Sequence, residues 1–402
     1  MIQRKLPRRR WLSTCVGTAV GLAALAGCTD ETSDDDGTEP SDDPGVTDDG
    51  SDFGPWPMIH YDAANTLTVP HDGLETDEKP EVLWTADLEG NVAPPVVYND
   101  TAYVGHGDGI YTAVDLTDEG EPLWHHETGR RRAPAAAAEG VFVAGDSVEA
   151  LEHGGDVRWT SEYEGGVESL RIYDGTLYAG FEDRVIAYDV DGEDLLEFET
   201  EATVQSLAVD DEHVYVRSRP DPDEDDFVMA GYDRNSGDDL WEHDIHHGQQ
   251  WVDDRVTRTF PVIDGTVYTV NDDAVLSIDG SSGELTNAAE LEHASWTRPT
   301  VYDDTAYLQR GSLAYDLETG KEPSEWDPDL SADTPFIIAG EVGYSITSAG
   351  VLDPHELLAV GVKTGEVHWE KQAPERTDFH FPLILNDIII IPEDDNGLVA
   401  FG

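Results

Sequence analysis

The chain has 402 residues, of which 86 are acidic and 23 basic, so its formal net charge is −63. Nucleic-acid binding needs surfaces rich in Lys and Arg, so this charge argues against it. Only two cysteines are present, which excludes a disulfide-built scaffold and a metal centre with four thiolate ligands.

Acidic residues occur along the whole chain, and lysine is scarce, with 5 Lys against 18 Arg. This composition is typical of proteins from extreme halophiles; the alternative is an acidic secreted protein from a low-salt organism. In molar salt the Debye length is about 3 Å, so repulsion among the carboxylates is screened. We therefore expect a halophilic protein.

Residues 1–27 have the features of an export signal. They contain five basic residues and no acidic ones, and Arg8 and Arg9 begin a twin-arginine pattern over residues 8–12. The apolar stretch at 14–26 is shorter than a membrane-spanning helix and fits a signal peptide. We predict export by the twin-arginine route.

The signal ends in the sequence Leu-Ala-Gly-Cys, at residues 25–28, which resembles a lipobox. In signals of that kind the peptide is removed before the cysteine, which is then lipidated; the alternative is a chance cysteine near an ordinary cleavage site. We predict that residues 1–27 are a twin-arginine lipoprotein signal peptide and that Cys28 carries the lipid. The expected location is the outer face of the cytoplasmic membrane, at the cell surface.

Residues 28–54 are predicted to be a disordered acidic tether. Positions 29–54 contain 11 acidic residues and no Lys or Arg. Such a segment cannot bury enough apolar surface to offset the entropy lost on ordering, so it stays extended. We expect it to hold the folded part, residues 55–402, away from the membrane.

An internal repeat fills residues 55–402. A turn followed by a β-rich run occurs eight times, at 99–103, 139–142, 174–178, 211–215, 264–268, 303–307, 340–344 and 386–390. Most copies continue with a small residue, an apolar residue and an acid, and then a Gly turn that leads to Trp, as in Gly120 and Trp124. Each copy predicts four short strands joined by tight turns, and no sustained helical period is present.

Four strands in about 40 residues, repeated radially, indicate an all-β fold, an eight-bladed β-propeller of four-stranded antiparallel blades. Seven blades are the alternative, because the copy at 332–374 is irregular. The last copy ends at 398–402 without a Trp strand, whereas a spare Trp strand lies at 81–84. We predict that the strand at 81–88 pairs with the C-terminal blade and closes the ring, which removes open sheet edges.

The repeated Asp, Gly and Trp pattern resembles the repeat of the PQQ-like, quinoprotein-type β-propeller family. The segment containing Trp56, Asp62 and Asn65 is similar to the stretch that often precedes the first blade in such proteins. The resemblance covers about residues 55–402. Members of this family include quinone-dependent alcohol dehydrogenases and a lipoprotein scaffold of outer-membrane protein assembly, so the resemblance implies the fold more than the activity.

The resemblance implies a non-catalytic member. The dehydrogenases stack their quinone on a vicinal Cys–Cys disulfide and hold it with calcium, whereas the cysteines here are Cys15 and Cys28. We therefore expect no catalytic residue, no metal and no cofactor, PQQ included.

From these features we predict a monomeric, lipid-anchored binding or scaffold protein of the cell envelope. Its partner would be an envelope protein or an extracellular ligand, with membrane contact through the lipid anchor and no nucleic acid. The alternatives are a PQQ-dependent oxidoreductase-like enzyme and an extracellular sugar-binding module.

The first strand of each propeller blade lines the axis, so the connections between blades reach the channel mouth. These connections are enriched in Arg, and they also hold Trp and His. We predict a funnel for a ligand or partner made by Arg131, Arg132, His247, Trp251, Arg258, Trp296, Arg298 and His380. Arginine forks suit carboxylates, and aromatic faces suit peptide or sugar. The alternative is that these arginines neutralise carboxylates of neighbouring blades.

Overall fold

The computed structural model describes residues 50–74, 79–163, 165–220, 226–246, 259–271, 273–291, 298–308, 313–323, 326, 334–347, 355–373, 382–393 and 397–402. All of them belong to one compact unit, residues 41–402. The predicted export signal with Arg8 and Arg9, the predicted lipidation site Cys28 and the tether up to residue 49 lie outside the described residues.

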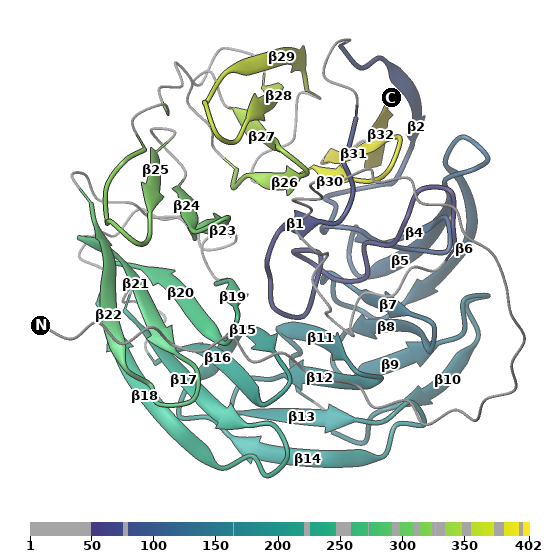
Figure 1. Ribbon diagram of the computed structural model, residues 1–402. Coiled ribbons are helices and arrows are strands. Elements are labelled where there is room, and N and C mark those ends of the chain that lie inside the picture. Colours follow the sequence, from purple (N-terminus) through teal and green to yellow (C-terminus); the bar gives the residue numbers. More distant parts are fainter. Residues whose placement is uncertain are drawn as a thin grey trace, which may run out of the picture. The chain divides into compact units, whose positions relative to one another are not determined.

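Eight sheets are arranged radially around one axis, which confirms the predicted all-β, eight-bladed propeller (Figure 1). Within each blade, consecutive strands pair antiparallel from the axis outwards. The described residues form no helix, and hence none with the length and apolarity of a membrane span.

The first four blades follow one another along the chain. Blade 1 consists of β3 (Val96–Tyr98), β4 (Thr101–His106), β5 (Ile110–Asp115) and β6 (Glu121–Glu127). Blade 2 consists of β7 (Ala135–Ala137), β8 (Gly140–Ala144), β9 (Val148–Leu151) and β10 (Val157–Thr160). Blade 3 consists of β11 (Ser169–Tyr173), β12 (Thr176–Gly180), β13 (Arg184–Tyr188) and β14 (Asp194–Glu199). Blade 4 consists of β15 (Thr203–Val209), β16 (His213–Arg219), β17 (Phe227–Asp233) and β18 (Asp239–Ile245).

The remaining blades include strands from both ends of the unit. Blade 5 consists of β19 (Val262–Ile263), β20 (Thr266–Val270), β21 (Ala274–Asp279) and β22 (Leu285–Glu290). Blade 6 has three described strands, β23 (Thr300–Tyr302), β24 (Thr305–Leu308) and β25 (Leu313–Asp316). Blade 7 consists of β26 (Ile337–Ala339), β27 (Val342–Thr347), β28 (Glu356–Gly361) and β29 (Val367–Gln372), with β1 (Thr68–Val69) parallel to β26. Blade 8 consists of β30 (Leu383–Ile384), β31 (Ile389–Glu393), β32 (Gly397–Phe401) and the outer strand β2 (Val82–Ala86).

The ring is closed by pairing between the two ends of the unit. Strand β2 runs antiparallel to β32, with Trp84 opposite Ala400. Two backbone hydrogen bonds between Glu81 and Gly402, of 2.9 and 3.0 Å, extend the pairing. This arrangement confirms the predicted closure, and it removes the free edge that an open ring of sheets would expose.

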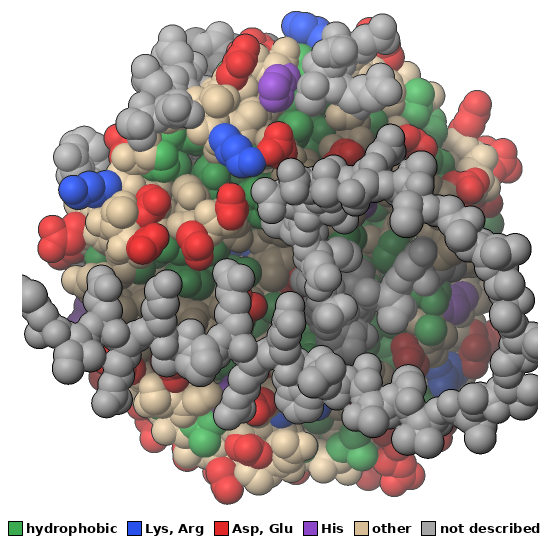
Figure 2. Space-filling model, in the orientation of Figure 1, with side chains coloured by type: hydrophobic (Ala, Val, Ile, Leu, Met, Phe, Trp, Pro, Cys, Tyr) green, Lys and Arg blue, Asp and Glu red, His purple; other side chains and the backbone are tan. Residues whose placement is uncertain are grey.

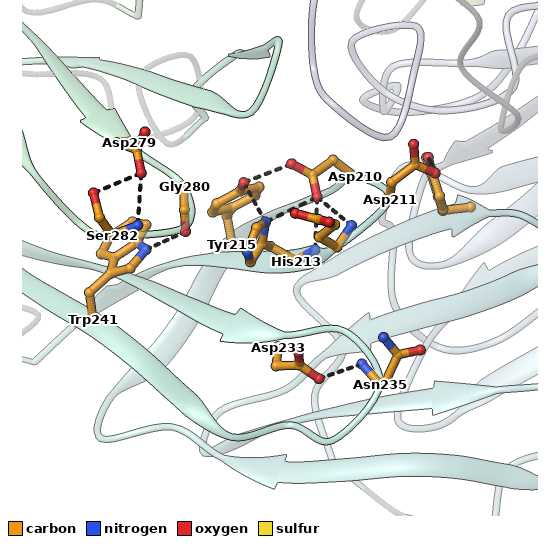
Figure 3. Close-up of polar contacts among 12 residues, drawn as sticks. Asp210, Asp211, His213, Tyr215, Asp233, Asn235, Trp241, Asp279, Gly280 and Ser282 are labelled. Carbon is orange, nitrogen blue, oxygen red and sulfur yellow. Dashed lines mark hydrogen bonds and ion pairs between the residues drawn. The ribbon is translucent and has the colours of Figure 1, made fainter. Parts of the chain in front are cut away.

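The repeated Asp, Gly and Trp residues join neighbouring blades. In blade 5 the backbone N–H and the hydroxyl of Ser282 both donate to Asp279 at 2.7 Å, which orders the turn between β21 and β22 (Figure 3). The indole N–H of Trp241 in blade 4 donates to the Gly280 carbonyl at 2.7 Å. A Cβ atom at Gly283 would lie 2.5 Å from Trp241, so only glycine permits this contact. The repeat therefore encodes contacts between blades as well as turns.

Residues 53–69, here called the axial segment, cross the axis of the ring. Their backbone forms hydrogen bonds with five inner strands, through the pairs Trp56 and Val97, Pro57 and Ala136, Ala63 and Val209, Ala64 and Val262, and Leu67 and Ile338. Figure 1 places this purple segment, with β1, in the middle of the ring. Several side chains of the segment are fully buried, so the axis is a packed interior at this level.

Candidate functional site

The two faces of the ring differ in their loops. We call the connection face the one where the chain passes from the outer strand of one blade to the inner strand of the next. The turns from each inner strand to the second strand lie on the opposite face, because strands within a blade are antiparallel. The axial segment bonds Val97, Val209 and Val262 near the carboxyl ends of their strands, and so lies towards the opposite face.

A pocket of about 880 Å³ opens on the connection face between blades 1 and 2. We call it the arginine pocket; it is lined by Gly90, Asn91, Gly107, Asp108, Gly129, Arg130, Arg131 and Arg132. These residues come from the connection before β3, the turn between β4 and β5, and the connection between β6 and β7. Residues about 40 positions apart in the chain therefore share one wall.

Three of the eight residues that line the arginine pocket are glycines, and close packing of glycine-containing loops shapes it. Gly109 has a φ of 100°, and a Cβ atom there would collide with the Arg130 backbone. A Cβ atom at Gly90, where φ is 79°, would lie 2.9 Å from the Gly107 Cα atom. The loops approach one another this closely only because glycine carries no side chain and tolerates positive φ. The pocket is therefore set by the packing of three loops.

The three arginines differ in their partners. The Nε atom of Arg130 donates to Asp146 at 2.5 Å, and a terminal nitrogen of Arg132 donates to Glu168 at 2.6 Å. Arg131 is half-buried, and no carboxylate of the described residues lies within ion-pair distance of it. Arg130 and Arg132 thus neutralise carboxylates of their own chain. The charge of Arg131 is not neutralised by a described carboxylate, although Arg131 lines the pocket. Such a cation is unusual in this acidic protein, and the face drawn in Figure 2 shows many more Asp and Glu than Lys and Arg side chains.

A second pocket, of about 510 Å³, lies on the opposite face between blades 4 and 5. We call it the carboxylate pocket because six of its lining residues are acidic, namely Asp62, Asp210, Asp211, Glu212, Asp264 and Asp279. Its floor includes Ala64 of the axial segment together with Val209 and Val262 of the inner strands.

Hydrogen bonds fix the acidic side chains of the carboxylate pocket. The Tyr215 hydroxyl donates to Asp210 at 2.7 Å (Figure 3). The Tyr173 hydroxyl donates to Asp211 at 2.8 Å. Burial raises the pKa of Tyr215, and the Asp210 carboxylate raises it further. Among the described residues, no three His, Cys, Asp or Glu side chains are grouped in a way that would hold a metal ion.

Charged groups are also buried beside the axial segment. Arg171 on β11 is 1% exposed and donates to the Asn65 side-chain oxygen at 2.5 Å, while Asn65 donates to the Leu207 carbonyl at 2.9 Å. Burial lowers the pKa of Arg171 to about 10, and Asp62 opposes this shift. Burial, together with repulsion from Arg298 and Arg171, holds the pKa of His60 well below its usual range. Burial therefore favours the neutral form of His60 in the folded protein.

Comparison with known proteins identifies the family. The chain matches the family described as outer membrane protein assembly factor BamB over residues 75–159 and 144–371. The chain belongs to this family. No curated protein sequence matches it significantly.

Solved structures share the fold of this BamB-family propeller at low sequence identity. BamB from Moraxella catarrhalis is 14% identical, with a TM-score of 0.59, over 80% of this chain and 99% of that one. The quinohemoprotein alcohol dehydrogenase from Comamonas testosteroni is 14% identical, with a TM-score of 0.64, over 86% and 80% of the two chains. A europium-containing methanol dehydrogenase is 13% identical, with a TM-score of 0.61, over 86% and 89%. The fold is thus shared by a BamB protein and by dehydrogenases.

The residues predicted for the funnel lie in different places. Arg131 and Arg132 line one pocket on the connection face. Arg298 is 3% exposed and lies in the interior, within electrostatic range of Arg171, so it does not line that pocket. The other five predicted residues lie outside the described part of the chain: His247, Trp251, Arg258, Trp296 and His380.

Three features of the site were not predicted from the sequence. The glycines at 90, 107 and 129 belong to separate connections and turns, and only their meeting in space makes them pocket walls. The segment around Trp56 and Asn65 resembles the stretch that often precedes the first blade in the PQQ-like family. That resemblance did not indicate that the segment crosses the axis of the ring. The carboxylate pocket was hidden because acidic residues are abundant throughout the chain.

Proposed function

We propose that this BamB-family propeller is a non-catalytic, lipid-anchored binding protein of the cell envelope, which holds an envelope protein or extracellular ligand on its connection face. The arginine pocket carries this proposal: Arg131 is a half-buried cation without a carboxylate partner among the described residues, on a chain with a net charge of −63. A pocket that is shaped by packed loops and contains one arginine without a described carboxylate partner is suited to capture a partner.

The absence of quinone chemistry is part of the proposal. The quinone site that resemblance to the dehydrogenases would imply includes a vicinal cysteine pair, and residues 55–402 contain no cysteine. The interior of the axis holds side chains of the axial segment, with Trp56 and Met58 fully buried. We therefore propose that the chain binds no quinone, and the absence of cysteine from residues 55–402 supports this.

Capture from membranes tests the binding proposal. We would express the full chain with its signal in a halophilic host, cross-link intact cells, and purify the protein in molar KCl. Asn91→Trp places a bulky side chain at the exposed rim of the arginine pocket, and Asn235→Trp makes the same change in an exposed turn on the opposite face. We expect the wild-type protein and Asn235→Trp to retain one enriched partner, and Asn91→Trp to lose it. Equal capture by both variants would contradict binding on the connection face.

An activity measurement separates this proposal from the enzyme alternative. The purified protein would be incubated with PQQ and calcium, and alcohol-dependent dye reduction would be followed. We expect no turnover above that of a heat-unfolded sample. Turnover that depends on the folded protein would overturn the non-catalytic proposal.

A further inference from the structure

Arg131 differs from every other arginine that lines the arginine pocket. Arg130 and Arg132 already hold Asp146 and Glu168, whereas no carboxylate of the described residues pairs with Arg131. Partial burial strengthens the interaction of such a cation with an incoming anion, because less water screens the pair. At molar salt, long-range attraction is lost, but direct hydrogen-bonded contact at this position persists.

We infer that the arginine pocket binds one carboxylate group, contributed by an Asp or Glu side chain of a protein partner, with Arg131 as its main contact. This inference rests on the proposed binding function and names the chemical group that is recognised. The planar guanidinium presents paired donors at the spacing of carboxylate oxygens. The two neighbouring arginines hold carboxylates in the same loop region, so the local geometry suits this ligand.

The charged residues of the pocket favour a ligand with one negative charge over a ligand with two or more. Arg131 is the one arginine lining the pocket whose charge is not neutralised by a described carboxylate, and Asp108 lines the same pocket. A dianion such as phosphate, or a polyanion, would leave negative charge uncompensated beside Asp108. A single carboxylate adds one negative charge beside Asp108 where a dianion adds two, so the carboxylate is the less strongly repelled of the two.

The walls of the pocket favour a peptide as the carrier of that carboxylate. The volume of about 880 Å³ accommodates a few residues, and the lining offers backbone groups of Gly90, Gly107 and Gly129 together with the Asn91 amide. Backbone and amide groups are the partners that a peptide chain satisfies by hydrogen bonding.

The first described residues of the chain lie at the opposite face of the ring. The Phe53 N–H donates to Asp100 at 3.1 Å, and the Asn386 N–H donates to the Phe53 carbonyl at 3.0 Å. Asp100 and Asn386 lie in turns on the opposite face, so the described chain begins away from the arginine pocket. Since no carboxylate of the described residues pairs with Arg131, the inferred carboxylate is assigned to a second molecule.

Peptide titration tests the inference. The probe is acetyl-Gly-Glu-Gly-amide, with acetyl-Gly-Gln-Gly-amide as the uncharged match and inorganic phosphate as the dianion. The mature protein, labelled with ¹⁵N-arginine, would be titrated in molar KCl while the Nε–H signal of Arg131 is followed by NMR. We expect saturable shifts of this signal with the Glu peptide, and at least about tenfold weaker binding of the Gln peptide and of phosphate. Equal or tighter binding of phosphate or of the Gln peptide would overturn the inference.

Variants locate the binding site. Arg131→Gln should weaken binding of the Glu peptide about tenfold, and Arg131→Lys should recover part of the loss because it keeps the charge without the fork. Asp108→Asn should tighten binding about threefold by removing a like charge. Lys363→Gln is the matched control, since it removes an exposed cation paired with Glu341 on blade 7, and binding should not change. Unchanged binding in Arg131→Gln, with the fold intact by circular dichroism, would refute the assignment.

The inference and the proposed function fail separately. If Asn91→Trp loses the membrane partner while Arg131→Gln keeps it and does not alter peptide binding, the proposed function stands and the carboxylate inference is wrong. If the Glu peptide binds at Arg131 but no partner is captured from membranes, the carboxylate site stands and the proposed function is wrong.

Discussion

The arginine pocket and the carboxylate pocket occupy opposite faces of one ring, and both are built from turns between otherwise similar strands. In the arginine pocket, glycines bring backbone walls together around Arg131. In the carboxylate pocket, aspartates such as Asp210 cap the turns and leave their charge facing a common space. The comparison teaches that the strands determine where the loops meet and a pocket forms. The residues of those loops then determine whether the pocket contains positive or negative side chains.

The two pockets also differ in what supports them. Asp62, Ala64 and Thr66 of the axial segment line the carboxylate pocket, whereas no residue of this segment lines the arginine pocket. Damage to the axial segment should therefore affect one pocket directly and the other only through global stability. The following predictions test this difference.

The largest effect is expected from Trp56→Ala. Trp56 is fully buried and packs edge-on against Tyr61 with ring centroids 5.3 Å apart, so its removal leaves a cavity in the axis. We expect the free energy of unfolding to fall by about 4 kcal/mol, measured by denaturant titration in molar KCl. Leu123→Ala, at a side chain that is 53% exposed, is the control and should change it by less than about 0.5 kcal/mol.

Below its unfolding transition, Trp56→Ala should still bind the Glu peptide at Arg131. Loss of peptide binding in a folded sample would mean that the arginine pocket depends on the axial segment, and the contrast between the pockets would fail.

The next largest effect is expected from Gly109→Ala, which disturbs the wall of the arginine pocket. The added Cβ atom would collide with the Arg130 backbone at a φ of 100°. We expect a loss of about 2 kcal/mol in the free energy of unfolding and weaker peptide binding. Gly129→Ala is the matched variant: φ is 79° there, but nothing lies within 4 Å of the added atom. Gly129→Ala should lower the free energy of unfolding by about 1 kcal/mol, from backbone strain alone. An equal loss in the two variants would contradict close packing of the loops.

Two buried tyrosines should report the different charges of the pockets at alkaline pH. Burial raises the pKa of Tyr111 beneath the arginine pocket, but Arg132 opposes this shift. Burial also raises the pKa of Tyr215 beside the carboxylate pocket, and Asp210 adds to the shift. Since both folded pKa values exceed the unfolded value of about 10, each phenol stabilises the fold below that pH, and the contribution is lost as pH rises through the folded pKa.

We therefore expect Tyr215 to ionise at a higher pH than Tyr111 in a titration that follows phenolate absorbance. The variants Tyr111→Phe and Tyr215→Phe assign the two signals. Asp210→Asn should lower the pKa of Tyr215 and leave that of Tyr111 unchanged. The reverse order of ionisation would contradict the assigned difference in local charge.

The smallest effect is expected from Arg130→Gln. Its ion pair with Asp146 joins side chains that are 45% and 76% exposed, so solvent and salt screen it. The free energy of unfolding should change by less than about 0.5 kcal/mol, measured in the same denaturant titration. Arg132→Gln should cost more, because Glu168 is only 17% exposed and Arg132 also donates to the Val167 carbonyl. Equal small changes would show that neither pair stabilises the protein.

Much of the fold was predictable because each blade carries its own local signals. Turn residues such as Asp174 and Gly175 have positive φ, as hairpin turns require, and the spare Trp84 strand indicated how the ring closes. Arg131 and Arg132 could be predicted to share a site because they are adjacent in the chain. The burial of Arg298 could not be predicted, because its connection resembles the others in composition but leads into the packed interior.

The sequence by itself determined the all-β propeller architecture, the strand that closes the ring and the acidic character of the chain, since these follow from local turn chemistry, alternation and charge counted along the chain. The structure decided for eight blades over seven. Only the tertiary structure decided that the axial segment crosses the ring, that three glycine-bearing loops from separate connections meet at one pocket, and that Arg131 is left without a described carboxylate while its neighbours are paired. The physical reason is that such features depend on contacts between residues far apart in the chain, and local signals carry no information about which of those residues meet.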